Sequence, residues 1–190
     1  MRTHDLSSLT LASWVTSDQH WQHPRIREYQ NRPADHFELM RRLWIERVKP
    51  DDVLLHLGDI VCFGDRAEHP RWMTGLPGRK LLLRGNHDDH SDQWYEAAGF
   101  EVIGRKPILW VVPGRIHQQV VCFSHEPDTE LFGWDINVHG HTHANPYWEH
   151  TPMLDYRNVC VEQTDYAPVR LRDVLYGTEG GRRLLVDSSV

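Results

Sequence analysis

Cysteine is scarce in this sequence of 190 residues, which contains only Cys62, Cys122 and Cys160 and no Cys-x-x-Cys pair. This spacing argues against a structural zinc knuckle and against a disulfide scaffold. Cys122 and Cys160 lie inside apolar runs, where a cysteine usually packs as a small core residue. We therefore expect a reducing, cytoplasmic compartment.

Long apolar runs and an excess of positive charge are also missing. No apolar stretch approaches the roughly 18 residues of a membrane span, and no charged leader precedes one. The formal net charge of −6 makes a broad basic surface for duplex nucleic acid unexpected, although it leaves room for a local basic groove. The hydrophobic content of 39% and the length predict a single domain over residues 1–190, without a membrane segment or an evident obligate protein partner.

Histidine, in contrast, is abundant, with 14 residues, and tryptophan contributes 8. Histidine is the commonest side-chain metal ligand and the usual acid–base group near neutral pH. Only histidines at predicted strand ends are informative, and we expect His90, His117 and His150 at the surface.

The first half of the chain alternates predicted strands and helices. Apolar runs predict strands at 9–15, 53–57 and 81–83. Helices are expected at 35–50, with a capping box of Asp35 and Glu38, at 66–73 and at 91–98, where Ser91 is the cap. One apolar face of the 35–50 helix should enter the core, formed by Phe37, Met40, Leu43, Trp44 and Val48. Residues 21–33 should form a loop with a short helix. This alternation favours parallel strands.

The second half is richer in short β-like runs. Residues 101–103, 108–112 and 119–123 resemble consecutive antiparallel strands of a second sheet. Further strands are expected at 135–138 and 158–161, and a short helix at 170–176. Residues 180–190 should be a tail or an edge strand.

Polar side chains follow five of these strands. A polar turn explains each one alone, but together they predict one shared edge where ligands bind. Asn86, His87 and Asp88 could supply there a neutral oxygen ligand, a proton donor and an orienting acceptor. The metal-competent residues at the strand ends are Asp18 and His20, Asp59, Asn86, His125, and His141 with His143.

Seven ligands exceed the three that a catalytic zinc ion usually takes, so the count indicates two ions. Two divalent ions about 3.5–4 Å apart can clamp the oxygens of a phosphoryl displacement. They would repel by roughly 19 kcal/mol at an effective dielectric constant of 20, so anions must lie between them. Asp59 can bridge through both oxygens, and a hydroxide can supply the second anion.

These motifs resemble those of the calcineurin-like metallophosphoesterases over most of the chain. The series is Asp18-x-His20, Gly58-Asp59, Gly85-Asn86-His87-Asp88, a lone His125 and Gly140-His141-x-His143. Residues 18–23, 29–33 and 158–162 further resemble a small stand-alone bacterial and phage subgroup. Gln19-His20-Trp21 and Ile60-Val61-Cys62 depart from the usual pattern without removing a ligand, which leaves the shape of the substrate pocket open.

The resemblance implies an α/β fold, a four-layer αββα sandwich of two mixed β-sheets flanked by helices. It implies one ion at Asp18, His20, Asp59 and His143, and another at Asp59, Asn86, His125 and His141. We expect Mn²⁺, with iron, Ni²⁺ or Zn²⁺ as alternatives. His87 would protonate the leaving oxygen or steady the developing charge, and Asp88 would orient the His87 ring.

Substrate contacts are less specific. Arg84, His23, Tyr29 and Arg32 are candidates for contacting the substrate, and Trp21, Trp134 and Trp148 for stacking a base, against the alternative that they only pack. The expected activity is hydrolysis of phosphate mono- or diesters by a metal-bridging hydroxide. A small nucleotide, a cyclic phosphodiester or a nucleic-acid end would suit an open cleft.

Two other functions compete with hydrolysis of phosphate esters. A non-catalytic metal-binding interaction scaffold of the same fold would be expected to have damaged ligands or no His87, and neither is the case here. A mononuclear hydrolase of another bond, such as an amide, would bind one ion per chain instead of two.

Overall fold

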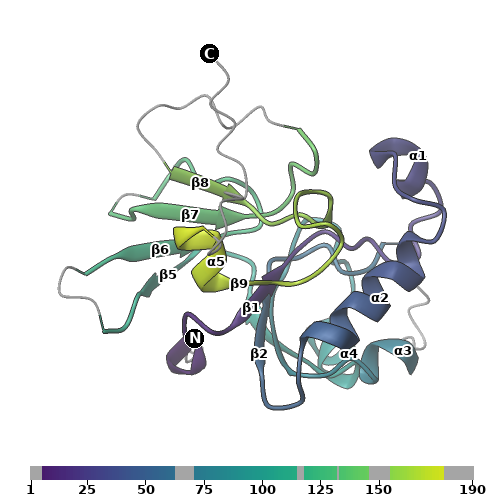
Figure 1. Ribbon diagram of the computed structural model, residues 1–190, viewed down its shortest axis with the longest axis horizontal. Helices are drawn as coiled ribbons and strands as arrows, with labels where there is room; N and C mark the ends of the chain where they lie inside the picture. Colours follow the sequence, from purple (N-terminus) through teal and green to yellow (C-terminus); the bar gives the residue numbers. More distant parts are fainter. Residues whose placement is uncertain (1–5, 63–70, 115–117, 132, 146–154, 178–190) are drawn as a thin grey trace.

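The computed structural model describes residues 6–62, 71–114, 118–131, 133–145 and 155–177. Its strands form two mixed sheets, and helices accompany them, as Figure 1 shows. The predicted α/β fold with two mixed sheets is confirmed and is consistent with an αββα sandwich.

The first sheet has five strands in the order β4-β3-β2-β1-β9. Strands β1 to β4 pair in parallel, and β9 is antiparallel to β1. The bounds are β1 Trp14–Thr16, β2 Val53–His56, β3 Arg79–Leu83, β4 Phe100–Gly104 and β9 Val169–Arg170. The parallel arrangement places the C-terminal ends of β1, β2 and β3 at one edge, as the alternation of elements predicts.

The second sheet has the order β5-β6-β7-β8. Its strands are β5 Ile108–Val111, β6 Val120–Phe123, β7 Ile136–His139 and β8 Asp155–Asn158. Only β5 and β6 pair antiparallel, whereas β6–β7 and β7–β8 are parallel. The expected run of antiparallel strands from residue 101 is therefore wrong. The helix before β4 is a crossover, and it returns β4 to the first sheet in parallel with β3.

Three helices pack on the first sheet: α2 His36–Arg47, α3 Arg71–Thr74 and α4 Asp92–Ala97. Their apolar side chains share a core with the outer face of that sheet, in which Met40, Trp44 and Tyr95 are buried. A second core between the two sheets includes Leu55, Phe123 and Val138, and residues of α5 Leu171–Tyr176 join it. Two layers of apolar packing thus fix the sheet edge on which the polar residues lie.

The sequence predicts some ends of helices and strands correctly and others incorrectly. Ser91 caps α4 as predicted, with its hydroxyl accepting from the Trp94 N–H at 3.2 Å. Asp35 precedes α2 but makes no side-chain capping bond, so the expected capping box is wrong. The strand predicted from Leu9 is only three residues long and begins at Trp14.

The strand expected at 158–161 is displaced: β8 ends at Asn158, and Val161–Gln163 forms a 3₁₀ turn. The short helix in the 21–33 loop is α1 Ile26–Gln30. The predicted 66–73 helix is described only from Arg71, and residues 180–190 lie outside the described residues. The longest described helix is α2, of 12 residues, and none of the described helices combines the length and apolar character that crossing a bilayer needs.

Candidate metal centre

The ends of five strands meet where the seven predicted metal ligands lie. Asp18, Asp59 and Asn86 follow β1, β2 and β3 of the first sheet. His125 follows β6, and the last two histidines, His141 and His143, follow β7. Because these strands are parallel within each sheet, their polar ends converge, as the sequence pattern predicts.

Five of these ligands have left-handed backbone conformations, with φ between 49° and 66°. They are Asp18, His20, Asp59, His141 and His143. Non-glycine residues rarely adopt this region, and such outliers gather at functional sites, where the surrounding structure holds them in place. These backbone conformations turn the chain sharply after each strand, so the ligand side chains lie close to the sheet edge.

In both Asp18 and Asp59, one carboxylate oxygen accepts a backbone N–H and the other faces the candidate metal centre. Asp18 Oδ2 accepts the His141 N–H at 2.9 Å, while Asp18 Oδ1 has no hydrogen-bond partner among the described residues. Asp59 Oδ1 accepts the His87 N–H at 2.8 Å, which leaves Oδ2 facing histidines. The carboxylates are thus fixed before any ligand arrives.

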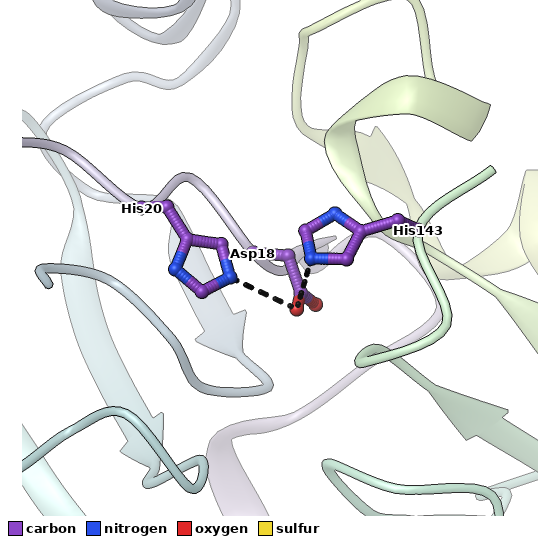
Figure 2. A group of neighbouring side chains, drawn as sticks. All are labelled: Asp18, His20 and His143. Atoms are coloured by element: carbon purple, nitrogen blue, oxygen red, sulfur yellow. Dashed lines mark ion pairs between the residues drawn. The ribbon is translucent and has the colours of Figure 1, made fainter. Parts of the chain in front are cut away.

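One candidate metal position lies among Asp18, His20 and His143, drawn in Figure 2. The two imidazoles flank the Asp18 carboxylate, with Nε2 of His20 and of His143 at 3.7 and 3.8 Å from Oδ1. His20 Nε2 also lies 3.4 Å from Asp59 Oδ2. A single cation between these atoms would contact two carboxylates and two imidazoles.

A second position lies on the other side of Asp59. Asp59 Oδ2 is 3.4 Å from His125 Nε2, the same distance that separates it from His20. Asn86 Oδ1 is 2.8 Å from His125 Nε2 and 3.1 Å from His141 Nδ1. Asp59 therefore stands between two sets of donors, as a bridging ligand would.

The buried polar atoms fit a bound cation. Asp18 Oδ1 and both ring nitrogens of His20 are buried and have no hydrogen-bond partner in the described part of the chain. Leaving such atoms unpaired is costly, and buried donors and acceptors normally have partners. A mixed set of imidazole and carboxylate donors suits divalent transition-metal ions, so the residues present fit the group.

Electrostatics favour the same reading. Burial alone would raise the pKa of Asp18, but the neighbouring imidazoles of His20, His125 and His143 hold it well below its usual range. Burial lowers the pKa of His125, yet the close Asp59 carboxylate and the charge of Asp18 raise it to about 9. The lowered pKa values of Asp18 and Asp59 keep both buried carboxylates charged, which favours a bound cation.

A backbone hydrogen bond on the ring nitrogen away from Asp59 orients His125. Its Nδ1 donates to the Leu57 carbonyl oxygen at 2.8 Å, because that oxygen can only accept. The hydrogen on Nδ1 leaves Nε2 directed at Asp59 and Asn86. A backbone contact of this kind selects the ring tautomer of a metal-binding histidine.

His87 is exposed at the rim of the candidate metal centre, with its ring centroid 5.3 Å from that of His20. Asp88 does not orient this ring, contrary to the prediction. Its buried carboxylate accepts N–H groups of Asp59, Ile60 and Gly85 at 2.8–3.1 Å and the Tyr95 hydroxyl at 3.2 Å. Asp88 therefore joins the loop after β3 to the turn after β2, whereas the His87 ring has Cys62 Sγ at 3.8 Å from Nδ1.

Both arginines predicted to contact substrate are engaged within the protein. Arg84 donates to the carbonyl oxygens of Asp88 and His90 and pairs with Asp92, so it holds its own loop. Arg32 is buried and contacts backbone oxygens and a carboxylate. Both guanidinium groups are thus bonded within the protein, and their contact with substrate stays a prediction.

The other predicted substrate residues stay near the rim. The His23 ring centroid is 5.9 Å from that of His20 and 5.8 Å from that of Tyr29, and Tyr29 is 57% exposed. Their contact with substrate stays a prediction. Trp21 cannot stack a base, because it is buried between Phe37 and Trp44.

Two further aromatic expectations have mixed outcomes. Trp134 is half-buried, donates to Asp128 at 2.9 Å and packs on Tyr156. His90, expected at the surface, is buried and stacks on Trp94. The remaining candidates His117, Trp148 and His150 lie outside the described residues.

Cys160 and Glu162 contact the site, although the sequence did not single them out as ligands or as their partners. Glu162 Oε2 lies 3.1 Å from His143 Nδ1, and Cys160 Sγ lies 3.3 Å from Asp18 Oδ2. The only sequence signal was the resemblance of residues 158–162 to a subgroup, which marks the segment but assigns no role.

Glycine is required at two close approaches. A Cβ at Gly85 would lie 2.2 Å from Asp59 Oδ1, and one at Gly140 would lie 2.3 Å from Asp18 Oδ2. Both distances are shorter than any real Cβ contact, so the glycines let their strand ends approach the two carboxylates.

A pocket of about 350 Å³ adjoins the second metal position. Asn86 and His125 lie on its wall, together with Arg105 and residues of the loop after β6, including Glu126 and Glu130. The arrangement offers space beside the ligands for part of a small molecule.

Known proteins resemble this chain over most of its length. The family profile "Calcineurin-like phosphoesterase" matches residues 12–166. Uncharacterized protein MJ1445 of Methanocaldococcus jannaschii is 29% identical over 181 residues, which cover 89% of this chain and 92% of that protein.

A phage protein and a solved crystal structure also resemble this chain. Gene 66 protein of Mycobacterium phage D29 is 41% identical over 78 residues, 40% of this chain and 39% of that protein. The crystal structure of the protein of unknown function AQ665 from Aquifex aeolicus superposes with a TM-score of 0.66 at 25% identity. It covers 85% of this chain and 96% of that one.

Proposed function

The chain belongs to the calcineurin-like phosphoesterase family, and from this premise we propose that it hydrolyses phosphate mono- or diesters with two divalent metal ions. The observation that carries the proposal is that Asp59 Oδ2 lies 3.4 Å from Nε2 of both His20 and His125, which belong to different donor sets. A carboxylate that contacts both sets can serve as a bridging ligand.

The donors divide into two sets that share Asp59. Asp18, His20 and His143 complete one set, and Asn86, His125 and His141 the other. When bound, two divalent ions supply positive charge to hold a phosphate and lower the pKa of water toward neutrality. We propose Mn²⁺ as the native ion, since the carboxylate and amide oxygens of the site suit it, with iron, Ni²⁺ or Zn²⁺ as alternatives that suit the imidazoles.

His87 is the proposed proton donor to the leaving oxygen. Its ring is exposed, lies beside His20 and is attached to a loop that the Asp88 carboxylate fixes through three backbone N–H groups. An imidazole placed in this way can give a proton to an alkoxide as it departs. The loop thus holds the ring at the edge of the metal centre, where Cys62 Sγ lies 3.8 Å from its Nδ1.

A small phosphorylated molecule or a nucleic-acid end is the proposed substrate class. The 350 Å³ pocket beside Asn86 and His125 can receive the part of the substrate beyond the phosphate. His23 and the exposed Tyr29 border the other metal position and are proposed to contact the substrate. The net charge of −6 disfavours a long duplex.

The test is a hydrolysis assay on the metal-free protein with Mn²⁺, Ni²⁺, Zn²⁺ or Mg²⁺ added separately. Bis(p-nitrophenyl) phosphate and p-nitrophenyl phosphate report diester and monoester cleavage. We expect Asp59→Asn to abolish turnover and His87→Ala to lower kcat by about 10²–10⁴-fold with both ions retained. His36→Gln, at the start of α2, is the matched control and should keep full activity.

The outcomes separate the competing functions. Two bound ions without turnover of any phosphate ester would support a binding scaffold instead. One ion per chain would support a mononuclear hydrolase. Unchanged turnover in His87→Ala would reject its proposed role while leaving the metal centre intact.

A further inference from the structure

A buried ion pair lies behind one half of the metal centre. Arg32 Nε and Nη2 are 2.8 and 2.6 Å from Glu162 Oε1, and the two side chains are 0% and 5% exposed. The partners are 130 positions apart in the sequence. Burying two charges has a desolvation cost that often exceeds their attraction, so stability alone is a poor reason for the pair.

Arg32 holds the turn that carries Asp18 and His20. Its Nη2 donates to the Asp18 carbonyl oxygen at 2.7 Å and its Nη1 to that of Gln19 at 2.6 Å. Asp18 and His20 both have left-handed backbones, at φ 64° and 49°. The planar guanidinium thus clamps a strained turn whose two side chains face the same cation position.

Glu162 holds the third ligand of that position. Its Oε2 lies 3.1 Å from His143 Nδ1, and because a carboxylate only accepts, the ring hydrogen is on Nδ1. In the neutral ring, Nε2 of His143 then carries no hydrogen and can bind a cation, and it lies 3.8 Å from Asp18 Oδ1. One ion pair therefore fixes the backbone of two ligands and the tautomer of a third.

The other half has only part of this support: Arg105 donates to the carbonyl oxygens of Gly85 and Asp88, in the loop of Asn86, at 2.9 and 2.6 Å. Asn86 is exposed and His141 is only half-buried, and among the described residues no ion pair contacts either one. His125 rests on a neutral carbonyl oxygen, that of Leu57. The two donor sets share Asp59 but differ in how firmly their other members are held.

We propose that Arg32 and Glu162 are positioning residues that make the two metal positions unequal. The position of Asp18, His20 and His143 is the tight one, and the position of Asn86, His125 and His141 exchanges its ion more readily. A carboxylate on the far nitrogen of a metal-binding imidazole raises its basicity, and removing such a partner typically costs about 10–100-fold in metal affinity. The inference rests on the proposed function only for the presence of two ions.

The test is a calorimetric titration of the metal-free protein with Mn²⁺. Wild-type protein should bind two ions in separate steps. Glu162→Gln keeps the shape of the side chain but removes its charge, so the tight step should weaken about 10–100-fold while the weak step is unchanged. Glu46→Gln is the matched control, because it alters the exposed Arg42–Glu46 pair on α2, and it should bind as wild type.

Arg32→Lys provides a second variant that keeps the positive charge but loses the planar fork. It should also weaken the tight step, and it decides the question if circular dichroism finds metal-free Glu162→Gln unfolded. Electron paramagnetic resonance at one equivalent of Mn²⁺ should give a mononuclear signal in wild type. In the variants it should show a larger free-ion signal.

The outcomes distinguish failure of the proposed function from failure of the inference about Arg32 and Glu162. Wild-type protein with fewer than two sites would overturn both the proposed function and this inference. Two sites whose affinities stay unchanged, or weaken together, in Glu162→Gln and Arg32→Lys would overturn this inference alone. A merely structural role would lower both affinities alike.

Discussion

Asp88 connects the two loops that carry Asp59 and His87, and replacing it with asparagine tests that connection. Oδ2 accepts the N–H groups of Asp59 and Gly85, both at 2.8 Å, and Oδ1 accepts the N–H of Ile60 at 3.1 Å. An asparagine retains one acceptor oxygen in place of two. Either orientation of the amide therefore faces at least one buried N–H with another donor.

The magnitude follows from these contacts. Leaving a buried donor unsatisfied costs about 1–3 kcal/mol, and the surviving bonds lose the strength that the charge gives them. Burial and the charge of Asp59 raise the pKa of Asp88, so removing its charge offsets part of the loss. We expect Asp88→Asn to lower the free energy of unfolding by about 2–3 kcal/mol.

The assay is equilibrium unfolding of the metal-free protein in urea. Tyr95→Phe is the matched control, because it removes the hydroxyl that bonds to Asp88 Oδ1 and to the His90 backbone but keeps the Asp88 carboxylate, and it should lose about 1 kcal/mol. A loss in Asp88→Asn no larger than that of Tyr95→Phe would refute the view that Asp88 fastens the two loops.

Three further predictions address other parts of the structure. Burial lowers the pKa of His56 from 6.5 to about 3, so the unfolded chain takes up a proton first as the pH falls. Between pH 7 and pH 5, wild type should therefore lose about 2 kcal/mol of unfolding free energy relative to His56→Asn in urea titrations, and parallel curves would contradict this. Gly140→Ala should displace Asp18 and reduce both Mn²⁺ affinity in calorimetry and stability, by about 1–3 kcal/mol. Gly114→Ala, which meets no neighbour, should keep its Mn²⁺ affinity. Saturating Mn²⁺ at 100-fold above Kd should stabilise the protein by about 2.7 kcal/mol per ion in thermal melts, whereas chelator-treated protein should show no gain on adding Ca²⁺ at the same concentration.

The ligand set was predictable because each member directly follows an apolar run. Leu81-Leu82-Leu83 marks β3, and the polar residues after it lie at the strand end by necessity. The order of elements then makes β1, β2 and β3 parallel, which brings Asp18, Asp59 and Asn86 to one edge.

The supporting contacts were not predictable in the same way. Arg32 and Glu162 come from a polar loop and a 3₁₀ turn, where no periodic pattern tells a buried charge from an exposed one. Asp88 illustrates a further limit: its residue type fits an orienting role, but the backbone N–H groups that it accepts are set by the path of a different turn. The sequence of a short strand does not indicate which sheet the strand joins. The prediction therefore placed β4 in the second sheet, whereas it pairs with β3 in the first.

The most direct measurement is anomalous diffraction from crystals of the protein grown with Mn²⁺. We predict two peaks, one among Asp18, His20 and His143 and the other among Asn86, His125 and His141, with the Asp59 carboxylate between them. A single peak, or none within reach of Asp59, would contradict the account.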